Sequence, residues 1–121
     1  PQGRKGGLSQ VPRVQGDIDI PVLTLHNLGD LFVPFHNEVV YAQRVASQGN
    51  GDLLVQRAIR GVNHCEFTPA EFSTAFLDLV AWETFGVKPA GDVVLDPAAV
   101  ANPLYGCNFT NGAHLLGTPC P

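Results

Sequence analysis

A histidine and an aspartate occupy positions at which they could form half of a nucleophilic catalytic site. His64 lies in the stretch RGVNHCEF (60–67), and Asp30 lies in LHNLGDLFVP (25–34). An aspartate that accepts the Nδ1–H of a histidine fixes the tautomer of the ring, and it stabilises the imidazolium that forms when the other nitrogen takes a proton. The two residue types therefore predict a general base and the acid that orients it.

Each of these residues follows an apolar run that is typical of a β-strand. Residues 20–26 (IPVLTLH) form a short β-branched run, which fits a strand buried on both faces. Residues 53–59 (LLVQRAI) predict a second strand, in which Gln56 and Arg57 indicate a position nearer the sheet edge.

Two helical patterns alternate with these strands. The first covers residues 35–48 and ends at Gly49, and the second is introduced by Thr68-Pro69-Ala70-Glu71, which combines an N-cap, a proline at the first helical position and the glutamate of a capping box. Gly86 is expected to end the second helix. The apolar stripe of the second helix is expected to pack in the core, and so is Trp82. The stripe consists of Phe72, Ala75, Phe76, Leu79 and Val80.

The order strand, helix, strand, helix predicts an α/β fold with parallel strands joined by a crossover. The carboxyl ends of such strands meet at one edge of the sheet, where loops carry functional residues. Asp30 and His64 are 64 − 30 = 34 residues apart, which leaves room for one helix and one strand. Two strands alone leave faces and edges uncovered, so we expect the chain to be incomplete in isolation.

These motifs together resemble the C-terminal segment of an α/β-hydrolase. PVLTLHNLGDLFVP is similar to the strand, turn and acid of that family, and RGVNHCEFTPAEF is similar to its Gly-x-x-His segment. The resemblance implies that Asp30 is the acid, that His64 is the base, and that Val33-Pro34 and Gly61 shape their turns. The family's chain order is serine, acid, histidine, and the likeness covers about residues 18–90.

The departures from the family pattern concern a turn and the nucleophile. Asn27 stands where the family often has glycine, and asparagine tolerates positive φ. No Gly-x-Ser-x-Gly is present, and Ser9, Ser47 and Ser73 do not lie on a strand-to-helix elbow. We therefore expect the serine on an N-terminal portion of the same hydrolase and no activity from this chain alone.

Two functions remain open at this stage. The first is the C-terminal portion of a serine hydrolase that acts on small carboxylic esters, with peptides as the second choice of substrate class. The second is a non-catalytic module that kept the scaffold for binding or assembly. In either case we expect the exposed sheet edge to pair with another chain, either the N-terminal portion of the same hydrolase or a second copy by self-association. His64 could also be a buried core histidine, and Asp30 a plain loop or cap residue.

Other titratable residues receive structural interpretations. No second Cys/His pair lies at zinc-ligand spacing from His64 and Cys65, so we expect no metal site, and we expect no cofactor. We interpret Cys65 as a buried thiol or as one half of a bridge to a cysteine outside this chain. The remaining histidines are interpreted as structural or surface residues, and two glutamates as helix-start acids favoured by the helix dipole; these residues are His26, His36, His114, Glu38 and Glu71.

The ends of the chain differ from its centre. Residues 1–17 have no periodicity and predict a linker, and residues 91–121 predict an irregular tail. A Cys107–Cys120 bridge would order that tail and would stabilise the folded state by about 3 kcal/mol. It would also indicate an oxidising, extracellular or periplasmic location. Asn108 begins a glycosylation sequon, which has meaning only if the source glycosylates.

The overall composition argues against two classes of partner. The formal net charge of −4, with only two small basic clusters, does not favour a nucleic acid or an anionic membrane as a partner. Apolar runs are far shorter than the ~20 residues of a spanning helix. The chain contains no methionine, so we expect a processed protein or a piece of a longer one.

Overall fold

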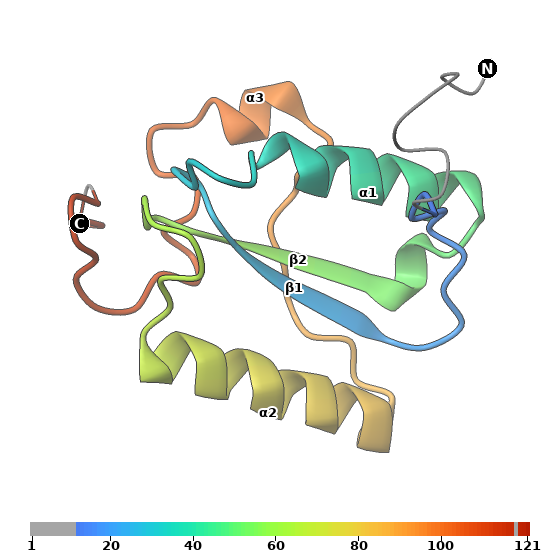
Figure 1. Cartoon of the computed structure of the whole chain (residues 1–121). Coiled ribbons are helices and arrows are strands. Elements are labelled where there is room, and N and C mark those ends of the chain that lie inside the picture. Colours follow the sequence, from blue (N-terminus) through green and yellow to red (C-terminus); the bar gives the residue numbers. More distant parts are fainter. Residues whose placement is uncertain (1–11, 118) are drawn as a thin grey trace, which may run out of the picture.

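The chain forms a small α/β fold, in the computed structural model that describes residues 12–117 and 119–121 (Figure 1). The elements are β1 (Val22–Asn27), α1 (His36–Ser47), the 3-10 turn η1 (Gly51–Leu53), β2 (Leu54–Ile59), α2 (Pro69–Phe85) and α3 (Pro97–Val100). The strands pair in parallel, from Val22 opposite Leu54 to Asn27 opposite Ile59. The predicted parallel strands and crossover helices are therefore confirmed.

The sheet lies between two helices. Figure 1 shows α1 on one face of the strands and α2 on the other. Val45 of α1 and Ala58 and Ile59 of β2 are fully buried, and Trp82 of α2 is 6% exposed. Because helices cover both faces, β2 reads as a nearly continuous buried strand rather than as an alternating one.

Helix α2 begins and ends as its sequence predicts. The Thr68 hydroxyl accepts the Glu71 backbone N–H at 3.3 Å, while the Glu71 carboxylate accepts the Thr68 N–H at 2.8 Å. Gly86 ends the helix with φ 70°, a conformation in which a side chain would be strained. This capping box fixes where α2 starts, and hence where the preceding loop of His64 must end.

The apolar stripe of α2 was wrongly predicted to be core throughout. Ala75 is 5% exposed, but Phe72 is 62%, Phe76 57% and Val80 43% exposed. The described sheet has only two strands, so part of the stripe extends beyond β1 and meets no further strand. The pattern indicated the correct helix face, but the described residues supply too little sheet to cover it.

Gln56 and Arg57, the residues that predicted a position of this strand nearer the sheet edge, are buried although β2 is an edge strand of the described sheet. These residues are 6% and 4% exposed, and β2 is more buried than β1. The outer edge of β2 is covered by the tail, because Asp92 N–H donates to Gln56 O at 2.7 Å and Ala58 N–H donates to Asp92 Oδ2 at 2.9 Å. The tail thus takes the place of a further strand.

The buried Arg57 is compensated by charge and aromatic contacts. Its guanidinium donates to Asp78 Oδ2 at 2.6 Å and to Ala90 O at 3.0 Å, and lies 4.3 Å from the centre of the Phe109 ring. A buried cation needs such partners, and two of the three come from the region after α2.

The tail is irregular apart from α3, which the sequence analysis missed. Asp96 caps this helix by accepting the Ala98 N–H, a signal present in the Asp-Pro pair. The predicted Cys107–Cys120 disulfide is present, with the Cα atoms 5.5 Å apart. The side chain of Asn108 donates to Asp92 Oδ1 at 3.1 Å.

The predicted N-terminal linker lies partly outside the described residues, since these begin at residue 12. Residues 12–17 are irregular and lie against α1, where Arg44 donates to Val14 O at 2.8 Å. Gly16 has φ 78°, and a Cβ there would be 2.4 Å from Val45 N. Glycine is thus required for this close approach.

Candidate functional site

Asp30 and His64 are brought together at the carboxyl ends of the two strands. Asp30 lies three residues after β1, and His64 lies five residues after β2. The Nδ1 atom of His64 is 2.7 Å from Asp30 Oδ2. The parallel pairing of β1 and β2 is what makes this contact between residues so far apart in the sequence possible.

Backbone donors favour the ionised form of Asp30. Asp30 Oδ1 accepts the N–H of Phe32 at 2.8 Å and that of Val33 at 2.9 Å. The Val33 hydrogen bond, together with the hydrogen bond and charge of His64 and the Phe32 N–H, outweighs burial and lowers the pKa of Asp30 to about 2. Asp30 therefore carries a negative charge near neutral pH.

The ring of His64 is open to solvent on the side away from Asp30. The His64 side chain is 48% exposed, whereas that of Asp30 is 5% exposed. Because the carboxylate of Asp30 accepts the Nδ1–H, the lone pair of the neutral ring is on Nε2. Within the described residues nothing bonds to Nε2, and the Phe32 ring packs edge-on at 5.8 Å.

The loop of His64 is braced by the C-terminal tail. Glu66 accepts the N–H of Leu115 at 2.8 Å, and this hydrogen bond is the main cause that lowers the pKa of Glu66. The buried Glu71 accepts Asn111 N–H at 2.7 Å and lies 2.8 Å from Nε2 of the buried His114. The structural interpretation of His114 and Glu71 is thus consistent with their contacts, but their role as tail anchors was missed.

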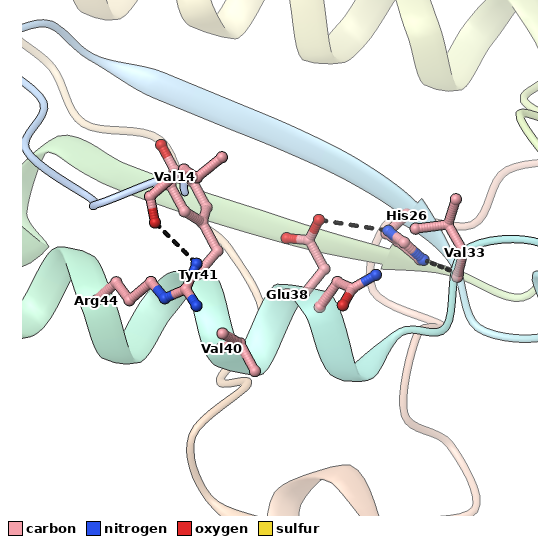
Figure 2. A pocket seen from close by; sticks show the side chains of 8 residues that line it. Val14, His26, Val33, Glu38, Val40, Tyr41 and Arg44 are labelled. Carbon is pink, nitrogen blue, oxygen red and sulfur yellow. Dashed lines mark hydrogen bonds and ion pairs between the residues drawn. The ribbon is translucent and has the colours of Figure 1, made fainter. Parts of the chain in front are cut away.

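A second polar cluster braces the loop of Asp30 (Figure 2). His26 Nε2 is 2.9 Å from Val33 O, and Nδ1 is 3.3 Å from Glu38 Oε1. Glu38 also accepts the hydroxyl of Thr24 at 2.6 Å and the amide of Gln56. His26, Val33 and Glu38 line one end of a hollow of about 400 Å³, which extends along α1 to Tyr41 and Arg44.

The cysteine and serine residues do not complete a nucleophilic site in the described residues. Cys65 is exposed and unbridged, so the expectation of a buried thiol was wrong; its φ of 53° turns the chain between His64 and α2. Ser47 lies at the end of α1 and donates to Arg44 O, and Ser73 is exposed within α2. Ser9 lies outside the described residues.

Within residues 12–117 and 119–121, no group of three or more His, Cys, Asp or Glu side chains could hold a metal ion. In the same residues, no helix is long and apolar enough to cross a membrane.

The geometry of Asp30 and His64 is that of an ionised carboxylate on Nδ1 and an open Nε2. Such a pair is suited to taking a proton from a nucleophile and returning it to a leaving group.

Two polar residues next to the site had a sequence signal that was not used. His26 and Asn27 are the last residues of β1, and their side chains contact the two loops that carry Asp30 and His64. Polar side chains at the end of an otherwise apolar strand are the signal that could have identified them. Their partners are backbone carbonyls, which no residue pattern reveals.

Comparison with known proteins gives one partial match. The chain is similar to an o-phthalyl amidase from Xanthobacter agilis, with 37% identity over 62 residues. The match covers 51% of this chain and 14% of the amidase, so the chain spans a small part of the relative's length. No protein-family model and no solved structure matches the chain. The similarity therefore links about half of this chain to part of a longer hydrolase.

Proposed function

We propose that the chain supplies the acid and base of a serine hydrolase, as the C-terminal portion of its α/β-hydrolase fold. The observation that carries the proposal is the 2.7 Å contact between Asp30 Oδ2 and His64 Nδ1, with Nε2 open to solvent. Two short motifs far apart in the sequence meet in the geometry of a base and its orienting acid. The partial similarity to an amidase supports the same class of chemistry.

In the proposed mechanism, His64 Nε2 takes the proton of a serine hydroxyl as that oxygen attacks the substrate carbonyl. Asp30 holds the ring and stabilises the imidazolium, and Nε2 then gives the proton to the leaving oxygen or nitrogen. In the second half of the reaction, Nε2 takes a proton from a water molecule that attacks the acyl-enzyme, and then returns it to the serine oxygen as the acid product leaves. Loss of the orienting carboxylate costs roughly 10⁴-fold in kcat in enzymes of this kind.

The proposed substrate is a small carboxylic ester. An o-phthalyl amide is a second candidate, because the similar protein is an o-phthalyl amidase. The two differ in the leaving group: an amine must be protonated before it departs, whereas an alkoxide can be protonated as it departs. Amide hydrolysis thus depends more strongly on the proton held at Nε2 of His64.

The proposed partner is the portion of the same hydrolase that contains the nucleophilic serine. A strand can dock on the outer edge of β1: the N–H of Leu28 bonds to Ile59 O, and since strand residues alternate, the backbone groups of Leu23 and Leu25 point away from β2. The described sheet has no strand at that edge. An unpaired strand edge favours β-pairing with another segment.

The apolar surface next to that edge supports the same partner. A groove of about 230 Å³ lies between β1 and α2, lined by Leu23, Leu25, Phe72 and Phe76, among others. Buried against a partner, the exposed side chains of α2 would contribute about 25 cal/mol per Å² of apolar surface. The tail, in contrast, already covers the outer edge of β2.

We also propose a secreted location. The Cys107–Cys120 disulfide supports an oxidising compartment, because such bridges persist outside the reducing cytosol.

The test uses the longer polypeptide that contains these residues, or this chain combined with the portion that carries the serine. We expect fluorophosphonate labelling of one serine and hydrolysis of a p-nitrophenyl ester, with an o-phthalyl amide assayed in parallel. His64→Ala should abolish both activities without changing the circular dichroism spectrum. His36→Ala, a change at an exposed histidine of α1, is the matched control.

Undiminished turnover in folded His64→Ala would contradict the assignment. A parent polypeptide without a reactive serine would favour the non-catalytic binding or assembly module. A lone chain that dimerises through β1 would favour self-association over the proposed N-terminal partner.

A further inference from the structure

The side chain of Asn27 contacts the loop that carries His64. Asn27 is the last residue of β1 and is 1% exposed. Its Nδ2 atom donates to the carbonyl oxygen of Asn63 at 2.7 Å, one residue before His64. Only the amide nitrogen can face a carbonyl oxygen, so this contact also sets the orientation of the amide group.

Gly61 leaves the space that Asn27 needs. A Cβ atom at position 61 would be 2.7 Å from Asn27 Oδ1, closer than such atoms approach. The absence of a side chain at Gly61 therefore allows the buried amide to lie against the base loop and reach Asn63 O. Asn27 Oδ1 itself has no hydrogen-bond partner in the described residues, so its contact with Asn63 is the bond that holds this side chain.

The preceding residue contacts the other loop. Successive side chains of a strand point to opposite faces, and His26 lies on the α1 side of β1, as Figure 2 shows. Its Nε2 donates to Val33 O at 2.9 Å, and the N–H of the same Val33 donates to Asp30 Oδ1 at 2.9 Å. Glu38 holds the other ring nitrogen at 3.3 Å.

We propose that His26 and Asn27 are positioning residues, His26 for the loop of Asp30 and Asn27 for the loop of His64. Two adjacent residues at the end of one strand reach both loops because the loops leave the same edge of a parallel sheet. The pair fixes both sides of the Asp30–His64 contact before any substrate binds. The catalytic consequence rests on the proposed function, whereas the positioning itself does not.

The test measures the Asp30–His64 contact directly, in the whole chain, by NMR. The carboxyl ¹³C signal of Asp30 reports its titration, and the ¹⁵N signals of the His64 ring report whether Nδ1 keeps its proton. Circular dichroism establishes first that each variant is folded. No serine and no substrate are needed, so the outcome is independent of hydrolase activity.

In His26→Ala, the Val33 N–H is no longer fixed, and we expect the pKa of Asp30 to rise from about 2 toward 3.8. His26→Gln keeps a nitrogen that can donate to Val33 O, and should restore the low value. A folded His26→Ala variant with an unchanged Asp30 titration overturns the role of His26.

In Asn27→Ala, we expect the ring of His64 to populate both neutral tautomers and the pKa of Asp30 to rise as the contact with His64 weakens. Gly61→Ala should have the same effect without altering Asn27, because the added Cβ displaces the amide. His36→Ala is the control and should change neither signal. Unchanged signals in a folded variant at position 27 or 61 overturn the role of Asn27.

In the complete enzyme the same variants should lower kcat with little change in KM, since the residues act on the base and not on the substrate. If the enzyme has no activity while the NMR changes occur, the positioning stands and the proposed function fails. If activity exists and the NMR signals do not change, the proposed function stands and the positioning is refuted.

Discussion

Removal of the Cys107–Cys120 disulfide should destabilise the chain by about 3 kcal/mol. The bridge joins residues 13 positions apart. Closing a loop of about 14 residues removes about 10 cal/mol/K of entropy from the unfolded state, which is about 3 kcal/mol at 25 °C. This loss is a large part of the roughly 5–15 kcal/mol by which typical small domains favour the folded state.

The native contacts of the tail should survive this change. The tail is also held by Leu115 N–H on Glu66 and by Asn111 N–H on Glu71, and neither bond involves sulfur. We therefore expect Cys107→Ser/Cys120→Ser to unfold at a lower urea concentration, by roughly 1–3 M for a typical slope. The protection of the two amides against hydrogen exchange should fall only in proportion to global stability.

The control is Cys65→Ser, because Cys65 is exposed and unbridged. A surface change of this kind is expected to alter stability by less than about 0.5 kcal/mol. The reasoning is refuted if the double variant is as stable as the wild type. Selective loss of protection at Asn111 and Leu115 would show instead that the bridge holds the tail in the folded state.

Three further outcomes follow from particular side chains. Thr68→Ala should cost about 1 kcal/mol, since it removes the N-cap of α2, and chemical unfolding measures this loss. The folded-state pKa of Asp30 is lowered to about 2, so its ionised form contributes stability that is fully present above about pH 3.8 and is lost as the pH falls through about 2. Acid unfolding of Asp30→Asn should lack this pH-dependent loss of stability. Burial first, and then the charges of Asp92 and Glu38, raise the pKa of Tyr105 to about 12, so the stability from its neutral form is present below pH 10.0 and is lost as the pH rises through about 12. Thermal melts of Tyr105→Phe in alkaline buffer should show a smaller decline than the wild type.

Local signals predicted the elements of this fold well. The second helix is the clearest case: Thr68 with Glu71 and Gly86 gave both of its ends, and the structure has them there. The apolar run before Asp30 gave β1 to within two residues. These features depend on groups close in sequence, so a single sequence contains the necessary information.

Long-range contacts were not predictable in the same way. The buried Gln56 side chain donates to Glu38 of α1, and Asp92 of the tail bonds the Gln56 backbone. The buried Arg57 side chain donates to Ala90 O, which follows α2. A polar residue in a strand ordinarily indicates exposure, and only the partner reverses that expectation. The exposure of Phe72 has the opposite cause, since the described residues provide no strand to cover it.

The candidate site was predictable because it depends on topology rather than on fine packing. Parallel strands bring their carboxyl ends together, so the positions of Asp30 and His64 after two such strands were sufficient to expect a contact. The supporting side chains were not identified. Asn27 appeared only as a substitute for glycine, because its partner is the backbone of Asn63 rather than a side chain.

The separate roles proposed for Asp30 and His64 are consistent with the electrostatics of the site. Asp30 accepts three hydrogen bonds, from Phe32, Val33 and His64, and its pKa of about 2 lies far below neutral pH. A proton taken up at Nε2 of His64 therefore remains on the ring, since the carboxylate is too weak a base to remove the one on Nδ1. In the proposed mechanism, Asp30 therefore stays ionised and accepts the Nδ1–H throughout, while the transferred proton is taken up and returned at Nε2.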